Sequence, residues 1–346
     1  LMNTPNSLLI RRSRRSSNLS FVALGLVAVG LVMMPYVVYQ SVTSSMVMLF
    51  VLVIIASMWN LLAGFGGLVS IGQQAYIGIG AYTVIVMADL GVHPLIGVFF
   101  GALTSAMLAL PTSWLAFRLR GDYFAVGTWV IAEVYRLVMI KFQFVGGADG
   151  KSLVGLSGLD PVMRSALTYW FALGIAILTV LGCFWLLRSR IGLALTAIRD
   201  DEVSARAGGI DATRIKRIVY LVSAAGCGLA GGILVVDALR VQPDAIFSVS
   251  WSAYMIFIVI IGGIGYLEGP LIGALVFFAM QQFLAEMGTW YLMLLGVLAI
   301  CAAAWFPKGL WGAFSQKTGF RLFPVGYHVA QRFDTPVDSR APLFRN

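Results

Sequence analysis

The chain has 346 residues, of which 60% are hydrophobic and 11% are charged, and its formal net charge at pH 7 is +9. Soluble globular domains carry about 25% charged residues, so this composition excludes an ordinary water-soluble domain and predicts a membrane protein. The positive charge does not indicate nucleic-acid binding, because it gathers in short segments between apolar runs, as membrane orientation requires.

Apolar runs long enough to cross a bilayer recur along the chain and predict an all-α, polytopic membrane helical bundle of about ten transmembrane helices. All basic clusters fall on one side when the chain is threaded from a cytoplasmic N-terminus, so both termini are expected to be cytoplasmic. The expected organisation is a basic N-terminal segment (1–18), a transmembrane domain (19–311) and a cytoplasmic C-terminal tail (312–346). The predicted spans are 19–39, 44–63, 67–88, 94–117, 123–145, 166–187, 218–239, 250–266, 270–287 and 289–306.

The cysteines and histidines form no metal-binding pattern. Cys183, Cys227 and Cys301 all lie in apolar runs, and the two histidines, His93 and His328, are far apart in the sequence. Because these spacings match neither a zinc site nor a disulfide framework, no metal site is predicted.

The stretch LVSIGQQAYIGIGAY, residues 68–82, interrupts the apolar pattern with glycines, hydroxyls and two adjacent amides. Small residues let helices approach closely, so tight packing alone would explain the glycines. Amides at membrane depth are unfavourable without partners and usually face a bundle interior or an aqueous route. We therefore expect a helix that packs closely and also lines a polar passage. The candidate passage residues are Asn60, Ser70, Gln73, Gln74 and Tyr76, and the candidate packing glycines are Gly72, Gly78 and Gly80.

An ionisable pair lies inside the predicted span 123–145. Glu133 and Arg136 are three residues apart, so on a helix they share a face and can pair. Ionisable groups within a span usually mark a transport route, although a bridge that only fixes helix packing is an equal alternative.

A long basic segment, residues 188–217, separates two predicted spans and contains AIRDDEVSARAGGI, residues 197–210. Acids at its start, a cation near its end and a glycine stop predict a short helix, with Asp200 as its cap. A helix with its own start and stop is more than a connecting loop requires, so we expect a docking element. Its candidate residues are Arg199, Asp200, Asp201, Glu202, Ala205, Arg206 and Gly208.

The stretch IGGIGYLEGPLIGA, residues 261–274, interrupts the later spans with glycines, a proline and an acid. It is either a tight cytoplasmic turn or a re-entrant break, because irregular backbone at membrane depth must be covered by protein or water. Its candidate structural glycines are Gly262, Gly263 and Gly265.

Taken together, five segments in the same order resemble the inner-membrane permeases of ABC importers for branched-chain amino acids, specifically the M-type subunit of the leucine/isoleucine/valine pair. They are residues 60–83, 118–138, 189–211, 262–274 and 305–312.

The resemblance implies a multi-pass protein of the bacterial inner membrane that works by alternating access. It also implies a second permease subunit, identical or related, two cytoplasmic ATPase subunits and a periplasmic binding protein. The short helix near residue 200 would then couple the chain to an ATPase. The chain contains no G-x-x-x-x-G-K-[ST] phosphate loop, so it is expected to be no enzyme and to need no cofactor of its own, with ATP hydrolysed by the partners.

Two alternatives remain open at this point. Asp149 stands in the expected external loop where relatives more often have asparagine, and Gln73-Gln74 also departs from the family pattern, so the solute could be urea or a short amide. A stand-alone ion-coupled transporter that uses Glu133 or Asp237 is the other alternative.

Overall fold

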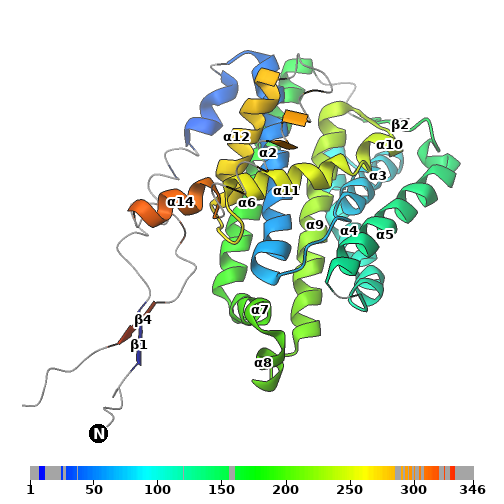
Figure 1. Ribbon diagram of the computed structural model, residues 1–346. Helices are drawn as coiled ribbons and strands as arrows, with labels where there is room; N and C mark the ends of the chain where they lie inside the picture. The colour runs from blue at the N-terminus through cyan, green and yellow to red at the C-terminus, as the bar shows by residue number, and fades with distance from the viewer. Residues whose placement is uncertain are drawn as a thin grey trace, which may run out of the picture.

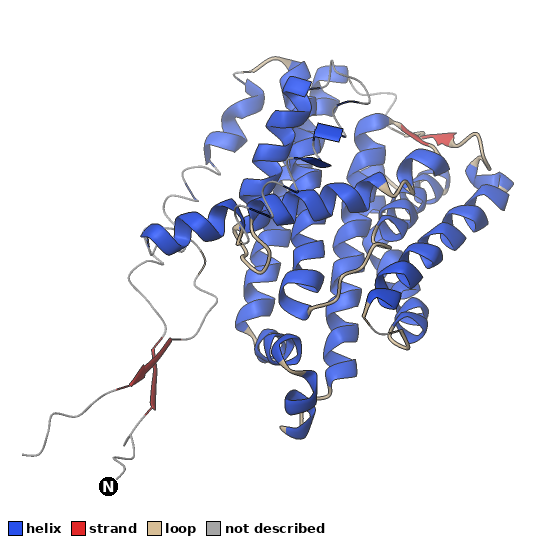
Figure 2. Ribbon diagram, in the orientation of Figure 1, coloured by secondary structure: helices blue, strands red, loops and turns tan. Residues whose placement is uncertain are grey.

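The computed structural model describes residues 8–11, 25, 29–36, 38–119, 121–155, 160–284, 308–318, 323 and 328–331, together with 290, 293–294, 296–297, 300 and 304. These residues form a helical bundle with two short antiparallel strand pairs (Figures 1 and 2). The helices are α2 (Gln40–Asn60), α3 (Gln74–Asp89), α4 (Pro94–Ala116), α5 (Asp122–Lys141), α6 (Pro161–Arg188), α7 (Arg190–Asp200), α8 (Glu202–Ala207), α9 (Ala212–Ala238), α10 (Pro243–Ile246), α11 (Ser250–Gly262), α12 (Gly269–Leu284) and α14 (Gly309–Thr318). A π-helical turn, η1 (Leu61–Phe65), extends α2, and a 3₁₀ turn, η2 (Gln143–Val145), follows α5. Strand β1 (Leu8–Arg11) pairs with β4 (His328–Gln331), and β2 (Lys151–Ser152) pairs with β3 (Arg240–Val241).

The predicted helical class is confirmed, and six helices are long and apolar enough to cross a membrane. They correspond to six of the predicted spans and comprise Gln40–Phe65, Pro94–Ala116, Asp122–Lys141, Pro161–Arg188, Ala212–Ala238 and Pro243–Gly262. The predicted span 270–287 appears as the shorter apolar helix α12. Much of the predicted spans 19–39 and 289–306, of the basic segment 1–18 and of the tail lies outside the described residues. The count of about ten spans and the cytoplasmic termini therefore stay predictions.

The prediction of a continuous span over 67–88 is wrong. The chain leaves the helical path after Phe65, runs irregularly through residues 66–73 and becomes helical again only at Gln74. Gly67 adopts a left-handed conformation, with a φ of +66°, which ends the first helix without the strain that a side chain would add. The predicted connection between spans 44–63 and 67–88 is therefore too early and too short, because the apolar residues Leu68, Val69 and Ile71 made the irregular stretch resemble the start of a span.

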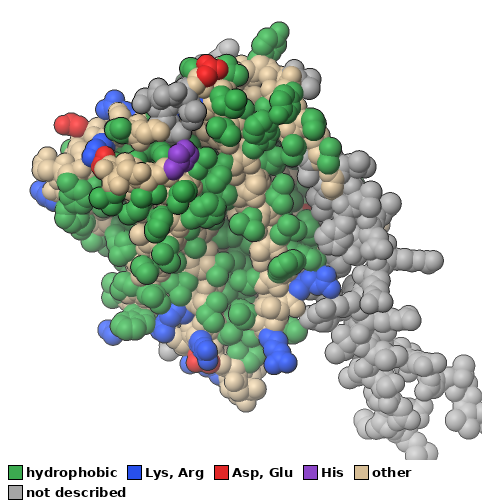
Figure 3. Space-filling view, turned by 180° about the vertical axis from the view of Figure 1, so that it is seen from behind, with side chains coloured by type: hydrophobic (Ala, Val, Ile, Leu, Met, Phe, Trp, Pro, Cys, Tyr) green, Lys and Arg blue, Asp and Glu red, His purple; other side chains and the backbone are tan. Residues whose placement is uncertain are grey.

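Helix α2 stands at the centre of the bundle and is buried along most of its length, with α6, α9, α11 and α12 packed against it. Helix α3 is enclosed by α4 and α9 (Figure 1). Helices α4 and α5 instead turn large apolar side chains outward, and Figure 3 shows hydrophobic side chains over much of one side of the molecule. Lipid tails solvate such side chains as well as a protein core does, so this face is suited to the bilayer.

Glycines let α3, α4 and α9 touch through their backbones. A Cβ atom added at Gly80 would lie 2.2 Å from the carbonyl oxygen of Gly228, and one at Gly101 would lie 2.8 Å from that of Gly80. Two heavy atoms cannot approach this closely without displacing a helix, so only glycine allows the observed crossing. The core around the irregular segment 66–73 therefore depends on close backbone contact.

Candidate functional site

Residues 70–73, the second half of the irregular segment 66–73, are mostly buried, and side chains from three other helices bind the backbone there. The indole Nε1 of Trp59 donates to the carbonyl oxygen of Ser70 at 2.8 Å. The hydroxyl of Thr128 accepts from the Ile71 amide at 3.1 Å, and the hydroxyl of Ser252 donates to the Ile71 carbonyl at 3.2 Å. Buried backbone groups outside helices need such partners, because no water reaches them. The break in the helix is therefore a built feature of the bundle.

The two adjacent amides of the predicted passage lie inside this core. Gln73 donates from Nε2 to the hydroxyl of Ser70, and its Oε1 accepts from the Ser223 hydroxyl at 3.4 Å and weakly from the Cys227 thiol at 3.6 Å. The Oε1 atom of Gln74 accepts from Ser252. Ser70, Gln73 and Gln74 are all at most 1% exposed, so these side chains stabilise the broken helix from within. That they also line a passage stays a prediction.

Tyr76 begins a second buried polar contact one turn further along α3. Its hydroxyl donates to the hydroxyl of Tyr220 on α9 at 3.0 Å, and Ser105 on α4 donates to its backbone carbonyl at 3.0 Å. Sequence reasoning did not single out Tyr220, Ser223 or Ser252. The spacing of Tyr220, Ser223 and Cys227 places them on one face of a helix, and this pattern of polar groups in an apolar run was the available signal.

The remaining glycines of this stretch also make room for neighbouring elements. A Cβ atom at Gly72 would lie 2.2 Å from the carbonyl oxygen of Thr128, and one at Gly78 would lie 2.3 Å from the ring of Phe247. Both positions therefore bring α3 and the segment before it against α5 and the α10–α11 connection.

The turn between α11 and α12 is attached to α2 by one buried amide. Asn60 donates from Nδ2 to the carbonyl oxygen of Tyr266 at 2.8 Å, and its Oδ1 accepts from the Gly265 amide at 2.9 Å. The turn also needs glycine, because Gly263 and Gly265 have φ values of +128° and +76°, and a Cβ atom at Gly262 would lie 1.9 Å from the Gly269 carbonyl oxygen. Asn60 is 1% exposed, so in the structure its side chain holds this turn by hydrogen bonds and does not face solvent.

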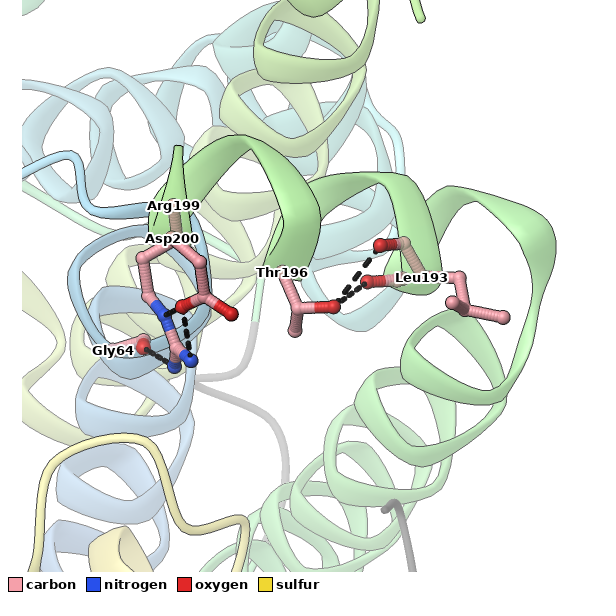
Figure 4. A network of polar contacts seen from close by, with 6 residues as sticks. Gly64, Leu193, Thr196, Arg199 and Asp200 are labelled. Atoms are coloured by element: carbon pink, nitrogen blue, oxygen red, sulfur yellow. Dashed lines mark hydrogen bonds and ion pairs between the residues drawn. The ribbon is translucent and has the colours of Figure 1, made fainter. Parts of the chain in front are cut away.

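Helix α7 is joined to the same end of α2. Arg199 extends from α7 and donates from Nη1 to the carbonyl oxygen of Gly64, in the π-helical turn, at 2.9 Å (Figure 4). Its Nε and Nη2 atoms bind one carboxylate oxygen of Asp200, at 3.0 and 2.8 Å. Turns of π-helix occur often at functional sites, and the last carbonyls of a helix lack partners within the helix. Arg199 supplies that partner and connects the two elements.

Helix α8 is the short helix predicted near residue 200, and it begins at Glu202. The prediction that Asp200 caps it is wrong, because the chain turns at Asp201 (φ −156°) and the Asp201 carboxylate accepts from the amides of Val203 and Ser204. Asp200 is one residue too early and pairs with Arg199 instead. The helix ends at Ala207 with Gly208 as its C-cap, in agreement with the predicted glycine stop, and Gly209 follows with a φ of +86°.

Charge pairs fix α8 against α9. The Glu202 carboxylate binds Lys216 and Arg206, each at 2.6 Å. Lys216 and then Arg206 lower the pKa of Glu202, and the hydroxyl and amide of Ser204 lower the pKa of Asp201. Both carboxylates are therefore stabilised in their charged forms.

The two sides of α8 differ. Ala205 is buried against α7 and α9, whereas Val203 is 78% exposed. Beside the helix lies a cavity of about 760 Å³. Its walls come from α8, from residues 67–69 of the irregular segment, from the α4–α5 connection and from the start of α9, and they include Phe117, Phe124, Asp122 and Lys216. The cavity leaves room between α8 and the start of α5.

The ionisable pair on α5 belongs to a group of three. Arg136 binds Glu133 through Nε at 2.9 Å and also binds Asp244 on α10, which the sequence did not indicate. Glu133 is 45% and Asp244 78% exposed, so the group lies on a face that no described part of this chain covers. Helix α5 buries only Phe124, Thr128 and Ala132.

No group of three His, Cys, Asp or Glu side chains in the described parts of the chain lies close enough to hold a metal ion.

A bundle of apolar helices with an irregular segment covered by protein in its core is the architecture of a multi-pass membrane protein. Residues 41–303 match the family described as the permease component of branched-chain amino acid transport systems. The chain belongs to this family. It is a family of transport permeases and not of enzymes, and with six apolar helices the chain is a multi-pass membrane protein.

Relatives with curated descriptions are also transport permeases. The chain is 28% identical to the high-affinity branched-chain amino acid transport system permease protein LivM of Salmonella typhimurium and to that of Escherichia coli, over 80% of this chain and 71% of each relative. It is 27% identical to the fructose import permease protein FrcC of Rhizobium meliloti, over 62% of this chain and 63% of that protein. No solved structure matches the chain.

Proposed function

We propose that this chain is the membrane-spanning subunit of an ABC importer that moves branched-chain or related amino acids into the cytoplasm by alternating access. The family match over residues 41–303 supports the substrate class. The likeness to FrcC extends over a shorter part of the chain, so a sugar is the weaker candidate.

The observation that carries the proposed mechanism is the construction of α8. This helix has its own cap, stands at the end of the bundle with Val203 exposed, and is tied through α7 and Arg199 to Gly64. In our proposal this end is cytoplasmic, one ATPase subunit binds α8, and ATP binding shifts it. Arg199 passes the shift to the π-helical turn and the irregular segment 66–73, and the cavity beside α8 gives the helix room to move.

The exposed charges on α5 support the presence of a second permease subunit. Charged groups within a span must face protein or a water-filled passage, because lipid does not solvate them. Glu133, Arg136 and Asp244 are open on this chain, so we propose that an identical or related subunit covers α5 and that the solute passes between the two. Asn60, Ser70, Gln73, Gln74 and Tyr76 would then shape the passage wall from behind. A periplasmic binding protein delivers the amino acid, and the assembly lies in the inner membrane.

The docking role of α8 is tested best at a residue with no internal partner. Asp201 and Glu202 hold the helix together, so reversing their charges would damage the fold as well as the interface. Val203→Arg instead changes a side chain that is 78% exposed and borders the cavity beside α8, and Val154→Arg, at a valine that is 60% exposed outside α8, is the matched control. We expect Val203→Arg to abolish co-purification of the ATPase subunits and ATP-driven leucine uptake in proteoliposomes, and Val154→Arg to leave co-purification intact.

The same proteoliposomes separate the proposal from the stand-alone alternative. Leucine uptake that needs only an ion gradient, with no ATPase present, would contradict the importer assignment. Uptake of urea or a short amide in place of leucine would keep the mechanism and change the substrate.

A further inference from the structure

Three arginines that the transport cycle does not use lie where α4 ends and α9 begins. Arg118 follows α4 by two residues, and Arg214 and Arg217 are one turn apart at the start of α9. Helices α4 and α9 pack along each other, and the guanidinium carbon of Arg217 lies 5.8 Å from the centre of the Trp114 ring. Arg214 shares its face of α9 with Arg217, one turn later, and Arg118 lies in the turn that follows α4, four residues after Trp114.

Within the described part of the chain these arginines have no counter-charge. No carboxylate of the described residues lies within 4 Å of the three guanidinium groups, and the buried Nε of Arg217 has no acceptor among them. Asp211, the acid nearest to them on α9, accepts from the Arg214 backbone amide as the helix cap. Arginine cannot lose its proton at neutral pH, and a buried donor without an acceptor is destabilising. Arg118 and Arg214 are exposed, so the unsatisfied Nε of the partly buried Arg217 is the group that favours an anion here, with one of the other cations a turn before it on α9 and the other just after the neighbouring helix α4.

The position of the group indicates what carries that anion. Trp114 is 64% exposed, and the outward face of α4 beyond it consists of large apolar side chains. Figure 3 shows Lys and Arg side chains at the lower end of the face with hydrophobic side chains, and others at its upper left. A tryptophan beside cations at the edge of an apolar belt is typical of the membrane–water interface. A ligand here meets cations at one end and apolar side chains at the other. The apolar residues on the outward face of α4 include Phe100, Leu103, Met107 and Leu110.

We propose that Trp114, Arg118, Arg214 and Arg217 bind the phosphate headgroup of an anionic phospholipid whose acyl chains lie along α4. The guanidinium groups donate to the phosphate oxygens, and the exposed indole packs against the glycerol region. Basic pockets between transmembrane helices bind anionic lipid headgroups by this chemistry. The bound lipid fixes the end of α4 against the start of α9, next to the segment that leads to α8.

The test is native mass spectrometry of the purified chain with phosphatidylglycerol and phosphatidylcholine of equal chain length. We expect selective retention of phosphatidylglycerol and an affinity about thirtyfold lower in Arg214→Gln/Arg217→Gln, from about 1 kcal/mol for each cation near a membrane surface. Arg214→Lys/Arg217→Lys keeps the charge and should keep most of the binding. Arg188→Gln/Arg190→Gln is the matched control, because Arg188 also lies over an aromatic ring, that of Phe184, at 5.1 Å.

Several outcomes would overturn the proposal. These are equal phosphatidylglycerol binding by the glutamine variant and the unmodified chain, an equal loss in the Arg188/Arg190 control, or displacement of the lipid by inorganic phosphate, which would indicate a free-anion site. Thermal unfolding in detergent shows whether each variant is folded, and if the glutamine variant is not, the lysine variant and the phosphate competition still decide. The measurement uses neither ATPase nor transport, so its result is independent of the proposed function.

Discussion

Arg199 and Gly64 are separated by 135 residues and joined by one hydrogen bond, in which the guanidinium donates to the backbone carbonyl at 2.9 Å. The carbonyl belongs to a π-helical turn at the end of the most deeply buried helix, and the guanidinium belongs to the helix that leads to α8. A movement of α8 therefore has a direct polar connection to the centre of the bundle.

Replacing Arg199 should lower transport without weakening the binding of the ATPase subunits. Arg199→Ala leaves the Gly64 carbonyl without its partner but does not touch the exposed side of α8. Hydrogen bonds to charged groups contribute about 1.5–3 kcal/mol, so we expect leucine uptake to fall by about tenfold or more while the ATPase subunits still co-purify. Arg190→Ala, an exposed arginine at the start of α7, is the control and should transport normally. Unchanged uptake by Arg199→Ala would show that the contact transmits nothing.

Gly80 should not tolerate even one additional methyl group. A Cβ atom there would lie 2.2 Å from the Gly228 carbonyl oxygen, so Gly80→Ala must push α3 away from α9. Overpacking of this kind destabilises by about 1–3 kcal/mol, which we expect as a lower thermal midpoint in detergent. Gly174→Ala on α6 is the matched control, since nothing lies within 4 Å of its added Cβ atom and alanine favours the helix. Equal midpoints for the two variants would contradict the close crossing.

The cap of α8 should make this helix sensitive to acid. The pKa of Asp201 is lowered in the fold by hydrogen bonds from Ser204 and Val203. Its stabilisation is therefore complete above the unfolded-state pKa of about 3.9 and is lost as pH falls through the lower folded-state value. Glu202 adds to the same trend, because Lys216 lowers its pKa as well.

Hydrogen exchange of the amides of residues 202–207, corrected for the intrinsic effect of pH, measures this. At neutral pH, Asp201→Ala should open the helix roughly fivefold more often, while Asp201→Asn keeps an acceptor and should lose mainly the pH dependence. Asp200→Asn is the control and should leave α8 unchanged, because Asp200 pairs with Arg199. A larger effect at Asp200 than at Asp201 would contradict the assignment of the cap.

The sequence predicts those features that depend on neighbouring residues. Apolar runs bounded by charges locate six spans, and acids before a small-residue stretch locate α8. The break at 66–73 was not predictable in this way, because its partners Thr128 and Ser252 lie far away in the chain. Local composition likewise did not distinguish Asp200 from Asp201 as the cap, since the choice depends on one backbone turn.

The buried polar residues likewise combine a feature that the sequence predicts with one that only the fold determines. Their presence in apolar runs marked Gln73, Gln74 and Asn60 as unusual. Their partners depend on helix packing: Ser223 and Ser252 reach the two glutamines, and the backbone of the α11–α12 turn reaches Asn60. A polar residue in an apolar run thus indicates that a partner exists, and the fold decides which one it is.

The last prediction concerns the charge balance among Glu133 and Arg136 on α5 and Asp244 on α10. Arg136→Gln leaves the two carboxylates facing each other, whereas Glu133→Gln leaves a matched pair of Arg136 and Asp244. An uncompensated carboxylate at mid-membrane is unfavourable by about 2.5–3.5 kcal/mol, and we expect about 1–2 kcal/mol at this half-exposed group, where water screens the charges. Arg136→Gln should therefore lower the thermal midpoint and the yield of folded protein more than Glu133→Gln does. Adding Glu133→Gln to Arg136→Gln restores the original net charge of the group and should recover part of the yield. If Glu133→Gln is the more damaging single change, the group is not held by charge balance, and its place at the interface with a second subunit loses its support.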